Sequence, residues 1–155
     1  MHDPGAGELA GRNLKGHVTY AEGGDASAFA RVLGGLIEAN IGSRPEKRRD
    51  FDSLRARVCV YVTDIDAGVT LDFQGGSLVV HSALQEGCEL TIRADSETVM
   101  QLSNIRIGFA RMPNYLDSTG RDVVARMLRG RLRIHGLLGN LTTLNQVTRL
   151  FSVAE

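Results

Sequence analysis

Two segments that alternate apolar and polar residues, joined by a glycine pair, constrain the fold of this chain more than any other feature. Val69, Leu71 and Phe73 alternate with polar residues, and two glycines after Gln74 lead into SLVVHS over residues 77–82. The pattern predicts a hairpin of two antiparallel strands, each with one buried face. Such a sheet needs apolar cover, so other parts of the chain must supply helices that lie on it.

Three further segments have strand character. Residues 57–63 are β-branched and aromatic on both faces, which suits a central strand. Residues 88–93 alternate apolar and polar side chains, and residues 131–134 (RLRI) form a short fifth segment. We therefore expect a meander of half-buried antiparallel strands.

Apolar residues at three- and four-residue steps predict the helices. One helix starts at Asp25 as N-cap and ends near Gly42, and a short polar helix follows from Pro45. The remaining three are expected from Asp95 or Ser96 to about Ser103, from Ser118 or Thr119 to Gly130, and over residues 137–151. The predicted class is α+β, with a five-stranded, mostly antiparallel sheet and helices over one face.

Length and composition indicate one domain. The 155 residues are 43% hydrophobic, which is enough for a core, and residues 1–24 hold six glycines without an apolar period. We assign 1–24 as a flexible N-terminal lead-in and 25–155 as the domain. No apolar run approaches the roughly 20 residues that span a bilayer, and no signal peptide is recognisable. A cytoplasmic location is expected.

The sequence lacks the common catalytic and metal-binding motifs, so we predict no catalytic residues, no metal and no cofactor. Asp64 and Asp66 flank a strand end, where acid–base work is an alternative to the simpler turn role. The spacing of Cys59 and Cys88 gives no disulfide framework, so both are predicted to be small core residues. The histidines are dispersed and are predicted to be structural or surface residues.

Charge is balanced overall but divided unevenly along the chain. Residues 1–97 carry 10 basic and 15 acidic side chains (10 − 15 = −5), whereas residues 98–155 carry 8 and 3 (8 − 3 = +5). The zero net charge argues against blanket adhesion to nucleic acid, and the 16 arginines against 2 lysines are typical of a GC-rich bacterial genome. Five arginines of the second half are candidates for contact with an anionic membrane surface or ligand head, or for pairing with the acidic first half: Arg106, Arg111, Arg121, Arg126 and Arg129.

A resemblance to a known family rests on three segments. These are VTLDFQGGSLVVHS, TIRADSETVMQL, and the late strand RLRIHG (residues 131–136) followed by an amphipathic helix. Over residues 56–153 the chain resembles the sterol carrier protein 2 (SCP2) lipid-binding family. The resemblance implies a hydrophobic tunnel between the sheet and the C-terminal helix. Residues 104–129 depart from the family pattern as a longer, arginine-rich piece that we expect to form a lid.

The resemblance also implies the tunnel lining. The implied residues are Phe73, Met100, Leu128, Leu132, Leu141, Leu144 and Phe151, to which we add Phe109 and Met112 from the lid segment. The expected function is non-catalytic binding and carriage of a lipid, sterol or other apolar metabolite. Two alternatives stay open: an accessory protein of a bacterial pathway that makes a lipophilic metabolite, and an enzyme that uses the same tunnel as a reaction chamber.

Overall fold

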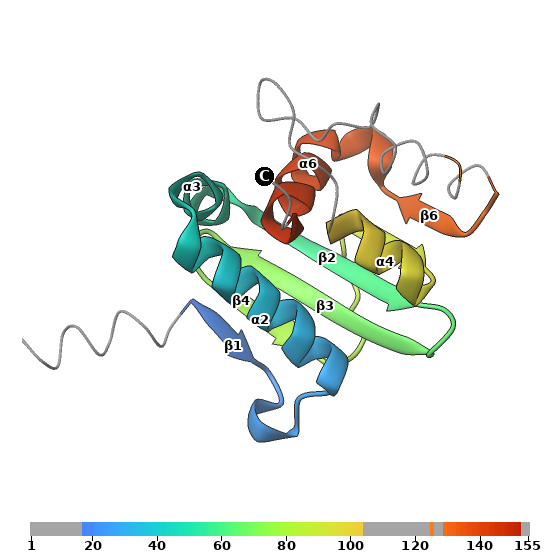
Figure 1. Cartoon of the computed structure of the whole chain (residues 1–155), viewed down its shortest axis with the longest axis horizontal. Helices are drawn as coiled ribbons and strands as arrows, with labels where there is room; N and C mark the ends of the chain where they lie inside the picture. The colour runs from blue at the N-terminus through green and yellow to red at the C-terminus, as the bar shows by residue number, and fades with distance from the viewer. Residues whose placement is uncertain (1–16, 104–124, 126–128, 153–155) are drawn as a thin grey trace, which may run out of the picture.

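The computed structural model describes residues 17–103, 125 and 129–152 (Figure 1). They form one six-stranded sheet with the order β1-β4-β3-β2-β5-β6. The strands are β1 (Val18–Tyr20), β2 (Arg55–Val62), β3 (Ala67–Gln74), β4 (Leu78–His81), β5 (Leu90–Ala94) and β6 (Leu132–His135). The helices are α2 (Ala28–Ser43), α3 (Pro45–Ser53), α4 (Ser96–Ser103) and α6 (Leu141–Phe151), with short 3-10 turns η1 (Gly23–Asp25) and η3 (Leu137–Gly139).

The α+β class is confirmed. Helices α2, α3, α4 and α6 lie on one face of the sheet (Figure 1). The predicted hairpin is also confirmed, because β3 and β4 are antiparallel with Leu71 opposite Val80 and Phe73 opposite Leu78. Gly75 and Gly76 turn the chain with φ of 69° and 98°, values that residues with a Cβ rarely adopt.

The strand count of five is wrong. Residues Val18–Tyr20, within the segment assigned as a lead-in, form an edge strand parallel to β4, with Val18 opposite Leu78. The first strand of the sheet was missed because three residues are too few for an alternation to be recognised.

The simple meander is also wrong. Strand β5 does not continue the antiparallel order beside β4 but lies parallel to the central strand β2. The connection over residues 82–89 crosses the outer face of the sheet, where the Thr70 hydroxyl donates to the carbonyl of Ala83 and accepts from the amide of Gln85, both at 2.8 Å. Because these hydrogen bonds join residues far apart in the chain, the local alternation of apolar and polar residues could not predict them.

Helix α2 begins later than predicted. Its N-cap is Ser27, whose Oγ accepts the Ala30 amide at 3.1 Å, while Asp25 belongs to η1. A serine hydroxyl caps as well as a carboxylate does, so composition alone could not choose between them. Pro45 occupies the first turn of α3 as expected. The C-terminal helix starts at Leu141 because Leu137–Gly139 form the separate turn η3.

The two cysteines form a disulfide, contrary to our prediction. Cys59 on the outer face of β2 is bonded to Cys88 at the end of the crossover connection. Cys59 is buried as predicted, but its burial comes from the crossing loop and not from the helix-covered core. Spacing failed as a guide because the crossover, a tertiary feature, brings together two positions 29 residues apart.

A candidate apolar binding pocket

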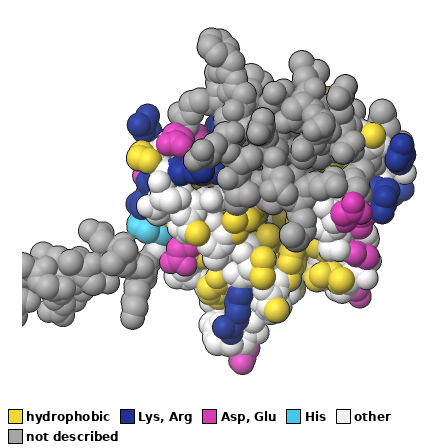
Figure 2. Space-filling model, in the orientation of Figure 1, with side chains coloured by type: hydrophobic (Ala, Val, Ile, Leu, Met, Phe, Trp, Pro, Cys, Tyr) yellow, Lys and Arg dark blue, Asp and Glu magenta, His cyan; other side chains and the backbone are white. Residues whose placement is uncertain are grey.

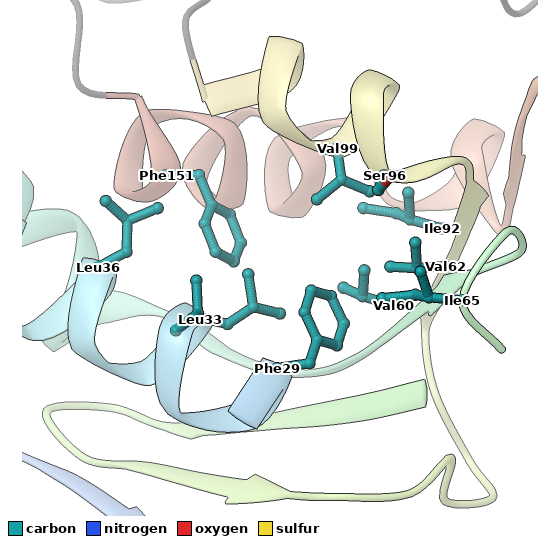
Figure 3. A pocket seen from close by; sticks show the side chains of 11 residues that line it. Phe29, Leu33, Leu36, Val60, Val62, Ile65, Ile92, Ser96, Val99 and Phe151 are labelled. Atoms are coloured by element: carbon teal, nitrogen blue, oxygen red, sulfur yellow. The ribbon is translucent and has the colours of Figure 1, made fainter. Parts of the chain in front are cut away.

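The helix-covered side of the sheet contains an apolar pocket of about 210 Å³ (Figure 3). Helices α2, α4 and α6 form its walls, and strands β2 and β5 form its floor. The described residues that line it are Phe29, Val32, Leu33, Leu36, Val60, Val62, Ile65, Ile92, Ser96, Val99 and Phe151.

The floor follows from strand register. Val60 and Ile92 are direct partners on the parallel strands β2 and β5, so their side chains lie next to each other on one face. Val62, two residues further along β2, extends the same face. Alternate residues point to the outer face, where the guanidinium of Arg93 stacks over the Tyr61 ring at 4.7 Å.

Helix α2 supplies the longest wall. Phe29, Val32, Leu33 and Leu36 recur at helical spacing and all contact the pocket. Leu33 is also part of the packed core, whereas Val32 is 64% exposed and forms a rim. Figure 2 shows apolar side chains gathered on the part of the surface where α2 lies. These residues belong to the apolar stripe that predicts the helix ending near Gly42.

Helix α6 contributes Phe151, and polar bonds hold the end of this helix in place. The buried amide of Asn40 donates to the carbonyl of Leu150 at 2.7 Å, and the buried ammonium of Lys47 donates to the carbonyl of Ser152. Both donors satisfy carbonyls that a helix end leaves without partners. Burial lowers the pKa of Lys47 to about 8.

Ser96, at the start of α4, is the one polar residue of the described lining. Its amide and hydroxyl donate to the two carboxylate oxygens of Asp64, at 2.8 and 2.5 Å. These bonds, the one from the hydroxyl above all, lower the pKa of Asp64. Because the serine proton is already used, the lining offers a ligand no free hydroxyl proton from Ser96.

The lining can bury hydrocarbon, and no acid, base or nucleophile of the described residues points into it with a free group. The volume exceeds the ~150 Å³ of an engineered apolar protein cavity that takes up benzene. In the described part of the chain, no group of three His, Cys, Asp or Glu side chains is arranged to hold a metal ion. Nor does any described helix have the length and apolarity to cross a membrane.

The predicted tunnel residues divide into three groups. Phe151 lines the pocket. Phe73, Leu132 and Leu144 are buried in the core, and Leu141 is 53% exposed and is not part of the described lining. Phe109, Met112, Leu128 and the side chain of Met100 lie outside the described residues, as do Arg106, Arg111, Arg121 and Arg126, whereas Arg129 is exposed in a turn.

The residues that line the pocket were mostly missed. Val60, Val62 and Ile92 belong to the strands predicted over residues 57–63 and 88–93, and Val99 belongs to the helix predicted to end at about Ser103. Core and pocket residues have the same composition, so only packing separates them.

The turn role of Asp66 agrees with the structure, in which it has φ of 48° and accepts a hydrogen bond from the Tyr61 hydroxyl.

A six-stranded mixed sheet with helices on one face and an apolar pocket beneath them defines a class of small α+β domains. The chain has the SCP2-like form of this fold. A solved structure described as a UbiJ-SCP2 ubiquinone synthesis protein is similar over 80% of this chain and 96% of its own, with a TM-score of 0.54 and 16% identity. A crystal structure of sterol carrier protein 2 is similar over 83% of this chain and all of its own, with a TM-score of 0.50 and 11% identity.

A third similar structure belongs to a much larger enzyme. The stereoselective inverting sec-alkylsulfatase Pisa1 from Pseudomonas sp. matches 86% of this chain with 18% of its own length, with a TM-score of 0.54 and 14% identity. No model of a protein family matches the sequence, and no curated protein does. At these identities the similarities establish the fold and nothing about the ligand.

Proposed function

We propose that this protein binds and carries a lipid, sterol or other apolar small molecule without chemical conversion, in the pocket between helices α2, α4 and α6 and the sheet. The observation that carries the proposal is the lining, in which ten of the eleven described residues are apolar and the eleventh, Ser96, is hydrogen-bonded to Asp64. A hydrocarbon surface of roughly 200 Å² hidden there is worth about 5 kcal/mol before the cost of association.

Filling the pocket tests the proposal. The Val99→Trp variant places a large ring where Figure 3 shows the Val99 side chain pointing into the pocket. We expect it to abolish the fluorescence gain of N-phenyl-1-naphthylamine, an uncharged apolar probe. Val79→Trp is the matched control, because Val79 alternates to the outer face of β4, between two buried residues. Undiminished probe binding by a folded Val99→Trp protein contradicts the proposal.

A second candidate is an accessory role in the synthesis of a lipophilic metabolite. It is favoured by the similarity to a protein described as functioning in ubiquinone synthesis, which the chain covers almost completely. Mass spectrometry of the protein purified from its own host separates the two candidates. A recurring pathway intermediate favours the accessory role, and a mixture of common lipids favours general carriage. Conversion of a bound intermediate by the purified protein identifies an enzyme instead.

Two earlier expectations belong to this proposal. Transient contact with an anionic membrane through the arginines of residues 104–129 is tested by co-sedimentation with anionic and neutral vesicles at low and high salt. A cytoplasmic location also stays a prediction. The Cys59–Cys88 disulfide weighs against it, since such bonds are rare where thiols are kept reduced.

A further inference from the structure

One end of the pocket carries a fixed negative charge. Asp64 lies at the turn between β2 and β3, and both of its carboxylate oxygens are held by Ser96, which lines the pocket. Donors on both oxygens stabilise the charged form and fix its position. Asp64 is exposed and is not itself part of the described lining, to which it is joined through Ser96.

The apolar rim at this end lies between two acidic residues. Ile65 lines the pocket and is 57% exposed, and Asp64 and Asp66 are its neighbours in the chain. Figure 3 places Ile65, Val62 and Ser96 together at one end of the pocket, away from Leu36 and Phe151. A ligand whose chain lies among these apolar groups and whose head leaves at this end comes close to Asp64, which is bonded to Ser96 of the lining.

Two described arginines lie near this end, and both are engaged. Arg131 is ion-paired with Asp95, the residue before Ser96, at 3.0 Å. Arg93 is next to Ile92 in β5, and strand alternation directs it to the outer face, where it stacks on Tyr61. None of the described lining residues carries a charge. Since the charge of Arg131 is balanced by Asp95, the carboxylates of Asp64 and Asp66 leave this end of the described pocket with a negative charge.

We propose that Asp64 makes the pocket selective for amphiphiles with a neutral or cationic head group, such as an alcohol or an amine, over those with a carboxylate or another anionic head. The inference rests on the proposed function, because it concerns the ligand of the same pocket. Burial of the ligand's hydrocarbon chain provides the binding affinity, and the charge of its head group determines which ligands bind more tightly. Asp64 is thus a specificity-determining residue that acts on the head group through charge.

Three ligands with the same ten-carbon chain test the proposal: decanol, decylamine and decanoate. Each displaces N-phenyl-1-naphthylamine from the wild-type protein, and the ratio of decylamine to decanoate affinity is compared among variants. Asp64→Asn removes the charge and keeps a carbonyl acceptor for Ser96. We expect it to lower this ratio by about tenfold at low salt. The matched control is Glu86→Gln, which removes the same charge from the crossover connection on the outer face and leaves the ratio unchanged.

The outcomes separate this inference from the proposed function. Failure of all three ligands to displace the probe overturns the proposed function. Displacement with a ratio that Asp64→Asn leaves unchanged, or tighter binding of decanoate than of decylamine by the wild type, overturns the head-group selectivity alone. If Asp64→Asn does not fold, the salt dependence of the wild-type protein provides the test. Its ratio of decylamine to decanoate affinity must decrease as the ionic strength rises from about 0.01 M to 1 M, because the Debye length falls from roughly 30 Å to 3 Å. A ratio insensitive to salt contradicts the proposal.

Discussion

The guanidinium of Arg149 on α6 forms a bidentate ion pair with the carboxylate of Asp50 on α3, with N–O distances of 2.9 and 3.0 Å. Both side chains are largely buried, at 14% and 9% exposed. Arg149 and Asp50 are 99 residues apart in sequence, so their ion pair joins α6 to α3. Arg149 precedes Phe151, the α6 residue that lines the pocket, by two residues.

Breaking this pair from one side is expected to destabilise the protein strongly. Arg149→Met removes the guanidinium that is paired with the buried carboxylate of Asp50, and we expect a loss of about 3 kcal/mol in the free energy of unfolding in urea. The double variant Asp50→Leu with Arg149→Met should lose less than Arg149→Met alone, because the two opposite charges of the pair are then removed together. A double variant as unstable as the sum of the single ones contradicts this account.

Lys47 is expected to make stability depend on pH in the alkaline range. Its pKa falls from 10.5 to about 8 on folding, mainly through burial and then through repulsion from Arg44. Between these values the unfolded chain holds a proton that the folded chain has lost, so the stability from this group rises with pH. The total gain between about pH 8 and 10.5 is at most about 3 kcal/mol.

The measurement is the difference in unfolding free energy between wild type and Lys47→Met at several pH values. The contributions of the other titrating groups cancel in this difference. Below pH 8 the lysine is protonated in both states, and the difference should be flat. A difference that stays flat up to pH 10 would mean that the folded protein keeps this ammonium group charged.

The disulfide should contribute substantially to stability. The bond closes a loop with a sequence separation of 29, for which the chain-entropy estimate is about 3–4 kcal/mol. We expect Cys59→Ala with Cys88→Ala to unfold at correspondingly lower urea, and a reductant to shift wild type to the same midpoint. The reductant should not affect the double variant. Two reactive thiols in the untreated wild type would refute the bond.

Gly136 is expected to tolerate no side chain. It has φ of 85°, and a Cβ built there would lie 2.0 Å from the backbone oxygen of Glu89. Gly136→Ala should therefore cost about 2–4 kcal/mol, because backbone must move as well as change conformation. Gly139→Ala, where a Cβ meets nothing within 4 Å, is the control and should change stability by less than about 1 kcal/mol. Equal thermal stability of the two variants contradicts the steric explanation.

Local sequence patterns correctly predicted the elements whose formation depends on interactions between residues close together in the chain. The β3–β4 hairpin follows from alternation around Gly75 and Gly76, and α3 follows from Pro45 at its first turn. Gly136, which ends the RLRIHG segment, was recognised as part of a sequence motif. The need for glycine there comes from the close approach of the Glu89 backbone, which is a tertiary contact. Strand partners, by contrast, were predicted only where two strands are neighbours in sequence.

The sequence by itself determined the α+β class of this fold: five of the six described strands, the four described helices, and the need for helices to cover an apolar face of the sheet. Periodicity carries that information because burial of one face acts on every residue of an element. Only the tertiary structure decided that Cys59 meets Cys88, that β5 lies beside β2, and that Val60, Ile92 and Val99 line a pocket. Those outcomes depend on contacts between residues far apart in the chain, and a buried valine has the same local pattern whether it meets another side chain or an empty space.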